Sequence, residues 1–465
     1  MNIKINFDNI CIVIFTFFFF FWGINIYNVD FLNTSSPNSQ YYKFLINFKL
    51  SYFVIFLTIP IFFNSFKKRD FSFNQIFNYQ QYILFFALFI LIHFFFIKIY
   101  YNEPIDNSEI ENLFYFISLS VIYCHYRNFI LVNFKKILTI YLIIFVSYSI
   151  IDGLQAVPQK LVGQCNNDLY LIDLMQKYLK IHLTKSIYLE NSHLAMMAVA
   201  VFFASIFIII QGAKNSILFV LLFSIEVLIV LNNLSTTYFV GYFFSHIALF
   251  LFWVKKINIK FWVITFLFLG INAYLFLSDK HCVNKITQFS FTDVKENIMD
   301  RGAHRGVQNP NLTTGIYQRS IIVAKETLIN HSLGWGIDGM DNANNKLLSG
   351  YSHPFKTLDD YDPLNPINDY AFYQLRFLNL KDGLSNFLKL VTEFGVFSIF
   401  IFLFFIKYLL NIKNISGYNV FVITLFITLC IRSAGFFNGG FIFCLFEFFY
   451  LEKYRKEIKL QEKVN

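Results

Sequence analysis

Arginine residues occur in this chain where polar sequence adjoins long apolar stretches. Arg432 ends one apolar stretch, Arg319 stands in a long polar segment, and Arg301 and Arg305 lie near the start of that segment. A guanidinium group stays charged and bonds phosphate oxygens in pairs, so all four residues are candidates for binding an anionic group. Each also has a structural interpretation. Arg319, Arg301 and Arg305 could be solvated, and Arg432 could reach from a membrane span to the polar surface.

Two carboxylates are candidates for taking a proton from a substrate hydroxyl. Glu190 opens an apolar stretch, and Asp382 lies just before another one that begins near Asn386. Burial or nearby arginines can give a carboxyl group the pKa that a general base needs. His193 follows Glu190 by one helical turn and could orient it or bind substrate. The alternatives are a helix N-terminal acid for Glu190 and a packing residue for His193.

Motifs for other kinds of chemistry are missing from the sequence. It contains no P-loop, dinucleotide-binding fingerprint, metalloprotease helix or nucleophile elbow. Its six cysteines do not have the spacing of metal ligands. We therefore expect no metal and no cofactor.

The composition is that of a membrane protein. Hydrophobic residues make up 56% of the chain and charged residues 14%, and the mean hydropathy is +0.53. This is too apolar for a soluble protein of such length. The formal charge of +9 could suit nucleic acid, but the basic residues lie mainly in short links and in the C-terminal tail. That placement orients a membrane protein, so we expect no nucleic acid partner.

The apolar runs predict the membrane spans. A helix needs about 20 apolar residues to cross the hydrocarbon core. We predict an all-α, polytopic membrane helix bundle of about 12 spans, near residues 9–27, 47–65, 80–99, 113–124, 137–152, 190–211, 216–232, 238–254, 261–277, 387–410, 418–436 and 439–452.

One large loop divides the membrane domain. The predicted parts are 1–277 with spans 1–9, the loop 278–386, and 387–465 with spans 10–12 and a basic tail. The Lys- and Arg-rich links fall on one side, which identifies the cytoplasm. Both termini are then cytoplasmic, and the large loop lies on the opposite side of the membrane.

The loop has the sequence of a folded cap. Tyr317, Ile321, Ala324 and Leu328 recur at helical spacing, which predicts an amphipathic helix with these residues on its packed face. The glycines of Gly334-Trp335-Gly336 would stop that helix.

Several segments resemble the O-antigen polymerase and ligase superfamily. Tyr317 to Ser320, followed by Gly334-Trp335-Gly336, resembles its outer-loop motif, in which an arginine opens a helix that ends in a G-x-G turn. Leu388 to Gly395 looks like the return of the chain into the membrane. Tyr188 to Met196 is similar to the family's E-P-S-x-x-A segment, with Asn191 in place of the proline. Arg432 to Phe437 is more similar to the Wzy-type polymerases.

The resemblance implies transfer of a glycan from undecaprenyl diphosphate to a sugar hydroxyl of another lipid-linked repeat unit. The reaction would take place at the periplasmic face of a bacterial inner membrane, among membrane lipids and beside a chain-length regulator and a flippase of the same pathway. The candidate catalytic residues are Arg319, Glu190, Arg432 and Asp382. The candidate substrate-binding residues are Arg301, Arg305, Trp335 and His193.

Two other functions stay open. O-antigen ligases typically carry a His-Asn pair just before the re-entry helix, where this chain has Leu384-Ser385, which favours a polymerase. A lipid-linked oligosaccharide flippase or other transporter should have ionisable residues inside its spans. The predicted spans contain few beyond His93, His246 and Glu226.

Overall fold

The computed structural model describes residues 73–102, 105, 107–155, 191–212, 217–233, 235–278, 312–348, 385–412, 414–432 and 440–449. Within these ranges the chain forms helices and no strands, and five helices are long and apolar enough to cross a membrane. The all-α prediction is confirmed for this part of the chain. The predicted spans 9–27 and 47–65 lie outside the described residues, and the total of twelve stays a prediction.

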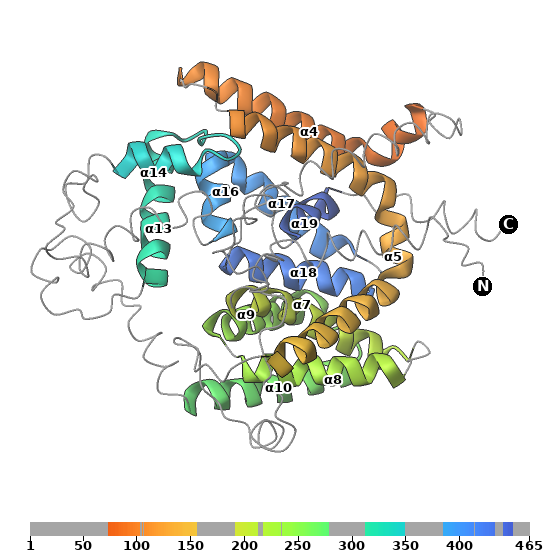
Figure 1. Cartoon of the computed structure of the whole chain (residues 1–465). Helices are drawn as coiled ribbons and strands as arrows, with labels where there is room; N and C mark the ends of the chain where they lie inside the picture. Colours follow the sequence, from red (N-terminus) through yellow and green to blue (C-terminus); the bar gives the residue numbers. More distant parts are fainter. Residues whose placement is uncertain are drawn as a thin grey trace, which may run out of the picture.

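The helices follow one another along the chain as shown in Figure 1. They are α4 (Phe73–Tyr100), α5 (Asn107–Gln155), α7 (Asn191–Ile210), α8 (Ile217–Asn232), α9 (Thr236–Trp253), α10 (Ile259–Ser278), α13 (Leu312–Asn330), α14 (Met340–Leu348), α16 (Asn386–Phe394), the 3₁₀ turn η5 (Gly395–Phe397), α17 (Ser398–Asn411), α18 (Gly417–Ile431) and α19 (Phe441–Phe448). The end of α10 and the start of α16 fall at the borders of the predicted loop.

Helix α18 lies at the centre of the bundle. Almost all of its residues are buried, as expected for a helix that is apolar on every side. Small residues let its neighbours come close. A Cβ added to Gly417 would lie 2.7 Å from the side chain of Ile208 in α7, and one added to Gly241 of α9 would lie 2.7 Å from Thr428. The start of α18 therefore meets the end of α7, so these two helices are antiparallel.

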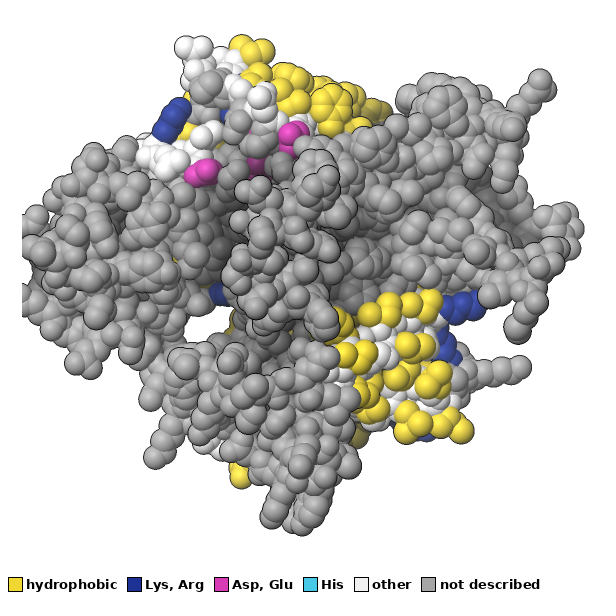
Figure 2. Space-filling model, in the orientation of Figure 1, with side chains coloured by type: hydrophobic (Ala, Val, Ile, Leu, Met, Phe, Trp, Pro, Cys, Tyr) yellow, Lys and Arg dark blue, Asp and Glu magenta, His cyan; other side chains and the backbone are white. Residues whose placement is uncertain are grey.

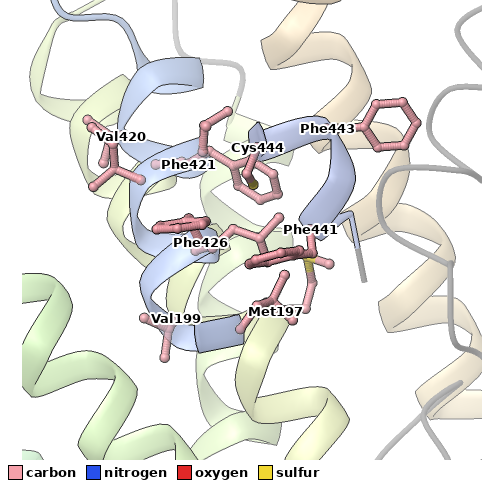
Figure 3. Packing of buried hydrophobic residues seen from close by; sticks show 14 of the residues in the cluster. Met197, Val199, Val420, Phe421, Phe426, Phe441, Phe443 and Cys444 are labelled. Atoms are coloured by element: carbon pink, nitrogen blue, oxygen red, sulfur yellow. The ribbon is translucent and has the colours of Figure 1, made fainter. Parts of the chain in front are cut away.

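Aromatic rings fill the space between α18 and α19. The rings of Phe426 and Phe441 are stacked with centroids 5.3 Å apart. Figure 3 shows them beside Met197 and Val199 of α7. Buried phenylalanines supply large apolar contact areas. This core fixes the positions of α7, α18 and α19.

Helix α5 corrects one feature of the predicted span pattern. The predicted spans 113–124 and 137–152 belong to one continuous helix, so the basic link expected between them is wrong. Figure 1 shows α5 curving, with its first part beside α4 and its last part beside α8. Arg127, Lys135 and Lys136 interrupt the apolar run, but this stretch has no glycine or proline to stop a helix.

The predicted loop helix is confirmed as α13, and its predicted packed face is right at Ala324, which is 4% exposed, but wrong at Leu328. Leu328 is 43% exposed, whereas Arg319, Ser320 and Thr327 are each fully buried. At the C-terminal end of the helix the buried position is Thr327, one residue before the predicted Leu328. Helix α13 packs against α16 through this partly polar stripe. The apolar spacing failed because polar residues take the inward positions.

The two ends of the bundle differ. We call the end where α13 and α14 lie the loop end; α16 begins there and α18 ends there, since Ser385 Oγ bonds Cys430 O at 2.6 Å. At the opposite end, α9 and α17 both end, since Trp253 Nε1 donates to Leu409 O at 2.9 Å. Lys256 Nζ also donates to Ile412 O at this end. The predicted cytoplasmic lysines Lys255 and Lys256 are therefore at the end opposite the loop helices.

Apolar side chains cover much of the described surface. Figure 2 shows a hydrophobic area where α5 and α8 lie in Figure 1, with basic side chains at one edge. Val132 of α5 and Ile217 of α8 are 75% and 79% exposed. Such a surface needs a lipid environment, which agrees with the predicted membrane character.

Candidate active site

Three segments that are far apart in the sequence adjoin at the loop end. Ser385 caps the start of α16 by accepting a hydrogen bond from Leu388 N, and it donates to Cys430 O near the end of α18. The hydroxyl of Tyr317 in α13 is hydrogen-bonded to the same serine. The segments around Tyr317, Ser385 and Arg432 therefore meet in one place.

Arg319 lies inside this junction. Its exposed fraction is 0%, so the alternative of a solvated helix face is wrong. Burial lowers the pKa of the guanidinium to about 10, while the charge of Asp341 in α14 acts in the opposite direction. The group therefore stays charged at neutral pH, and Asp341 balances its charge.

A second cation, Lys389, lies close to two carboxylates. Its Nζ is 3.9 Å from Asp338 Oδ1 and 3.6 Å from Glu393 Oε1. Asn112 of α5 donates a hydrogen bond of 2.7 Å to Asp338 Oδ2. Lys389 and Glu393 face inward because residues four apart share one side of a helix. Lys389 with its two carboxylates and Arg319 with Asp341 are two charged groups on segments that pack against one another, and we call these five residues together the charged cluster.

The backbone around Gly334 holds the charged cluster in place. Trp335 N donates to Thr392 O, Gly336 N to Glu393 O, and Val396 N to Ser332 O, at 2.8–3.1 Å. Gly334 and Gly395 have φ values of +86° and +52°. A Cβ at Gly334 would lie 2.3 Å from Glu393 O, and one at Gly395 would lie 2.0 Å from Ser332 O. Only glycine allows this close approach.

We expect Gly334→Ala to destabilise the protein by more than about 1 kcal/mol, because alanine disfavours positive φ and its Cβ would also meet the backbone. Two control variants separate these effects. Gly212→Ala has a positive φ of +68° but no atom within 4 Å of the added Cβ, and Gly270→Ala has neither problem. Thermal unfolding of the purified protein should rank the variants, with Gly334→Ala lowest. Equal stability of the Gly334 and Gly212 variants would contradict the contact.

Trp335, a predicted substrate-binding residue, is buried in a small apolar cluster with Val323, Met340 and Ala343. Its Nε1 donates to Thr327 Oγ1 at 3.1 Å. The structure therefore places it in the packing between α13 and α14. This packing holds α13 and α14 together. The role of Trp335 in substrate binding stays a prediction.

Contacts with α4 and α5 attach the loop helices to the bundle. His93 Nε2 lies 2.9 Å from Leu333 O. Lys98 Nζ is 2.7 Å from Glu109 Oε1, and Asn342 Nδ2 donates to the same oxygen at 3.4 Å. Lys98 and Glu109 are each 3% exposed. The described part of the loop is thus packed on the bundle through buried polar bonds.

Arg432 and His193 lie at the same end of the bundle as the charged cluster. Arg432 is partly exposed at the end of α18. His193 is in the first turn of α7, and α7 is antiparallel to α18, so its start lies near the end of α18. Glu190, Asp382, Arg301 and Arg305 lie outside the described residues, and their roles stay predictions.

Sequence reasoning missed a second group of buried charges. Arg127 donates to Glu447 through Nε at 2.9 Å and through a terminal nitrogen at 2.5 Å. The hydroxyl of Tyr123 also donates to Glu447 and lies 2.9 Å from the hydroxyl of Tyr418. Arg127 was predicted to lie in a cytoplasmic link, but it is 5% exposed. Because Arg127 and Glu447 are 320 positions apart, no local pattern could pair them.

Metal ligands do not gather in the described part of the chain. No three His, Cys, Asp or Glu side chains there are placed to hold an ion. The charged cluster instead combines two cations with three carboxylates. Such a set can bind anionic or hydroxyl groups and can exchange protons.

The fold and the cluster define a class of protein: a helical membrane protein with a polar, charged junction at one end. The chain matches no known family profile, no curated protein and no solved structure.

Proposed function

We propose that this chain polymerises undecaprenyl-diphosphate-linked oligosaccharide repeat units into O-antigen or a related surface polysaccharide. The meeting of three distant segments carries the proposal. The segments around Arg319, Glu393 and Arg432 each resemble the polymerase and ligase superfamily, and they adjoin at one end of the bundle. If the three resemblances had arisen by chance, the three segments would not be expected to lie next to one another in the fold.

The proposed reaction moves one glycosyl group. The oxygen of a sugar hydroxyl attacks the anomeric carbon of the donor, and the bond from that carbon to the lipid diphosphate breaks. The diphosphate leaves with the electron pair, so negative charge grows on it. Cations placed beforehand stabilise such charge. Arg319 and Lys389 are the buried cations of the junction and are proposed for this role.

Arg319 is covered in this state of the protein. We therefore propose that α13 and α14 act as a lid, which moves to admit the lipid headgroup and excludes water once it closes. The glycine contacts between 332–336 and 392–396 fix one edge of this lid. The donor is a membrane lipid, and a chain-length regulator and a flippase of the same pathway are the expected partners.

The same geometry bears on the ligase alternative. Ligases carry a His-Asn pair where this chain has Leu384-Ser385, so a leucine stands at the position of the histidine base. Ser385, at the position of the asparagine, is a helix cap whose hydroxyl donates to Cys430 O. This supports a polymerase over a ligase.

One observation favours a transporter as the second candidate. The buried Arg127–Glu447 pair adds to Glu226, which is 1% exposed in α8. Ionisable residues inside spans often mark transport paths. Arg127 and Glu447 bond each other directly, however, which is also what a structural pair does.

Surface glycans from a deletion strain distinguish the candidates. For a polymerase, a gel should show a single capped repeat unit in place of a ladder. Uncapped polymer left on the carrier lipid would identify a ligase, and missing exported intermediates would identify a flippase. Return of the ladder with the wild-type gene is the required control.

We expect the loop end to face the periplasm, because Lys255 and Lys256 lie at the opposite end. A reporter fused near Asn345 should then read periplasmic, and one fused after Lys256 should read cytoplasmic. Fusions after Lys68 and Asn465 should also read cytoplasmic. A cytoplasmic reading near Asn345 would exclude both the orientation and the reaction.

A further inference from the structure

We propose that Asp338 is the general base that accepts the proton of the attacking hydroxyl, and that Asn112 is its positioning residue. This assignment rests on the proposed transfer reaction. Neither residue was a candidate from the sequence, where Asp338 was one of many acids in the loop and Asn112 belonged to a predicted span edge.

Access distinguishes Asp338 from Glu393. The side chain of Asp338 is 11% exposed, whereas that of Glu393 is 0% exposed. Asp341 lies close enough to Arg319 for its charge to raise the pKa of the guanidinium, and it accepts a hydrogen bond from Asn345 at 3.2 Å. Asp338 is therefore the carboxylate beside Lys389 that stays partly exposed even while Arg319 is covered.

The backbone at Asp338 is strained. Its φ is +63°, and among the described residues only Asn102 shares a positive φ without being glycine. A left-handed conformation costs an L-residue free energy, and such strain is retained where the surrounding structure fixes a functional group. The contacts of Gly336 and Gly339 on either side impose this conformation.

Neighbouring groups fix the two carboxylate oxygens differently. Asn112 Nδ2 donates to Oδ2 at 2.7 Å, and Lys389 Nζ lies 3.9 Å from Oδ1. Lys389 is nearer to Glu393, at 3.6 Å, so its charge is shared between two carboxylates. A base needs a fixed orientation and an oxygen that can still accept a proton. Asn112 fixes the orientation of the carboxylate through Oδ2, while Oδ1 faces the shared charge of Lys389.

Atoms and electrons balance in the proposed transfer step. The acceptor O–H bond breaks, its proton goes to Asp338, and its oxygen forms the new bond to the anomeric carbon. The diphosphate departs with its electron pair. Asp338 then returns the proton to water, and no oxidant or metal takes part.

The test uses membranes that carry the full chain, supplied with lipid-linked repeat units extracted from a deletion strain. Asp338→Asn and Asp338→Gly both suit a left-handed backbone and should fold. Each should lose about 10²–10⁴-fold in rate, the usual contribution of a general base. Added formate should restore part of the activity of Asp338→Gly and none to Arg319→Lys, which still has its base.

Asn112→Ala should test the positioning role. The titratable groups facing Asp338 are Lys389 and Glu393, and Asn112 is its neutral donor. Loss of a hydrogen bond to a charged carboxylate should move the acidic limb of the pH–rate profile to higher pH. A purely structural Asn112 would lower the amount of protein without moving this limb.

The outcomes separate the two proposals. If wild-type membranes make no polymer from the lipid-linked units, the proposed function fails. If wild type makes polymer and Asp338→Asn matches it, or formate fails to restore activity to Asp338→Gly, the base assignment alone is overturned.

Discussion

Replacing Arg319 with alanine should abolish the polymer. The guanidinium is fully buried and its charge is balanced by Asp341. If it stabilises charge on the leaving diphosphate, its loss should cost about 10²–10³-fold in rate, as for other groups that stabilise charge in a transition state. Arg319→Lys should recover only part of this, because a single ammonium cannot bond two phosphate oxygens in a plane. The measurement is the glycan ladder of a complemented deletion strain.

The burial of Arg319 requires a control for folding. Arg319 is fully buried, so Arg319→Ala removes buried packing as well as a charge that acts on Asp341. The double variant Arg319→Met with Asp341→Asn removes both charges and should restore the level of folded protein. It should still make no polymer. A normal ladder from the double variant would show that Arg319 only holds α13 and α14 together.

The bundle itself was largely predictable from the sequence. Apolar runs located α7, α9, α10 and α17 because a membrane helix must satisfy its backbone internally and present apolar side chains to lipid. The border residues Ser278 and Asn386 were also visible as changes in composition. Apolar runs and changes in composition involve residues that are close together in the sequence, so one sequence is enough to detect them.

Helix α13 shows where periodicity fails. The apolar spacing placed Leu328 inward, but this side chain is 43% exposed and Arg319 takes the inward side. Apolar periodicity assumes that the partner surface is apolar. Here the partner is α16, whose Lys389 and Glu393 are buried and polar. Buried polar residues have no hydrophobic signature.

The charged cluster could be predicted only in part. Its Arg319 was found because a motif resembled a known family. Lys389 lies in the segment Leu388 to Gly395, which resembles the same family, but it was not chosen as a site residue, and Asn112, which contacts the cluster, lies in no motif. Asn112 and Asp338 are 226 positions apart, and their contact depends on how α5 and the loop meet. Asp338 did carry one local signal, since it follows Gly334 and Gly336 in a glycine-rich turn.

Breaking the Arg127–Glu447 pair should be the most destabilising single change in the bundle. Both residues are buried, and Tyr123, Tyr408 and Tyr418 also bond Glu447. This group joins α5, α17, α18 and α19. Glu447→Ala leaves Arg127 charged and buried, which costs about 3–5 kcal/mol for such pairs. Thermal unfolding in detergent should show a large loss, and the protein should be scarce in membranes.

A double variant distinguishes a structural pair from a transport path. Arg127→Met with Glu447→Leu replaces the pair by apolar side chains, which is often neutral for stability because the cost of burying two charges disappears. If the pair is structural, this variant should regain its level in membranes and make a normal glycan ladder. If the pair lies on a transport path, the folded double variant should lose exported intermediates. That result would favour a transporter over the polymerase, because the charged cluster at the loop end would still be intact.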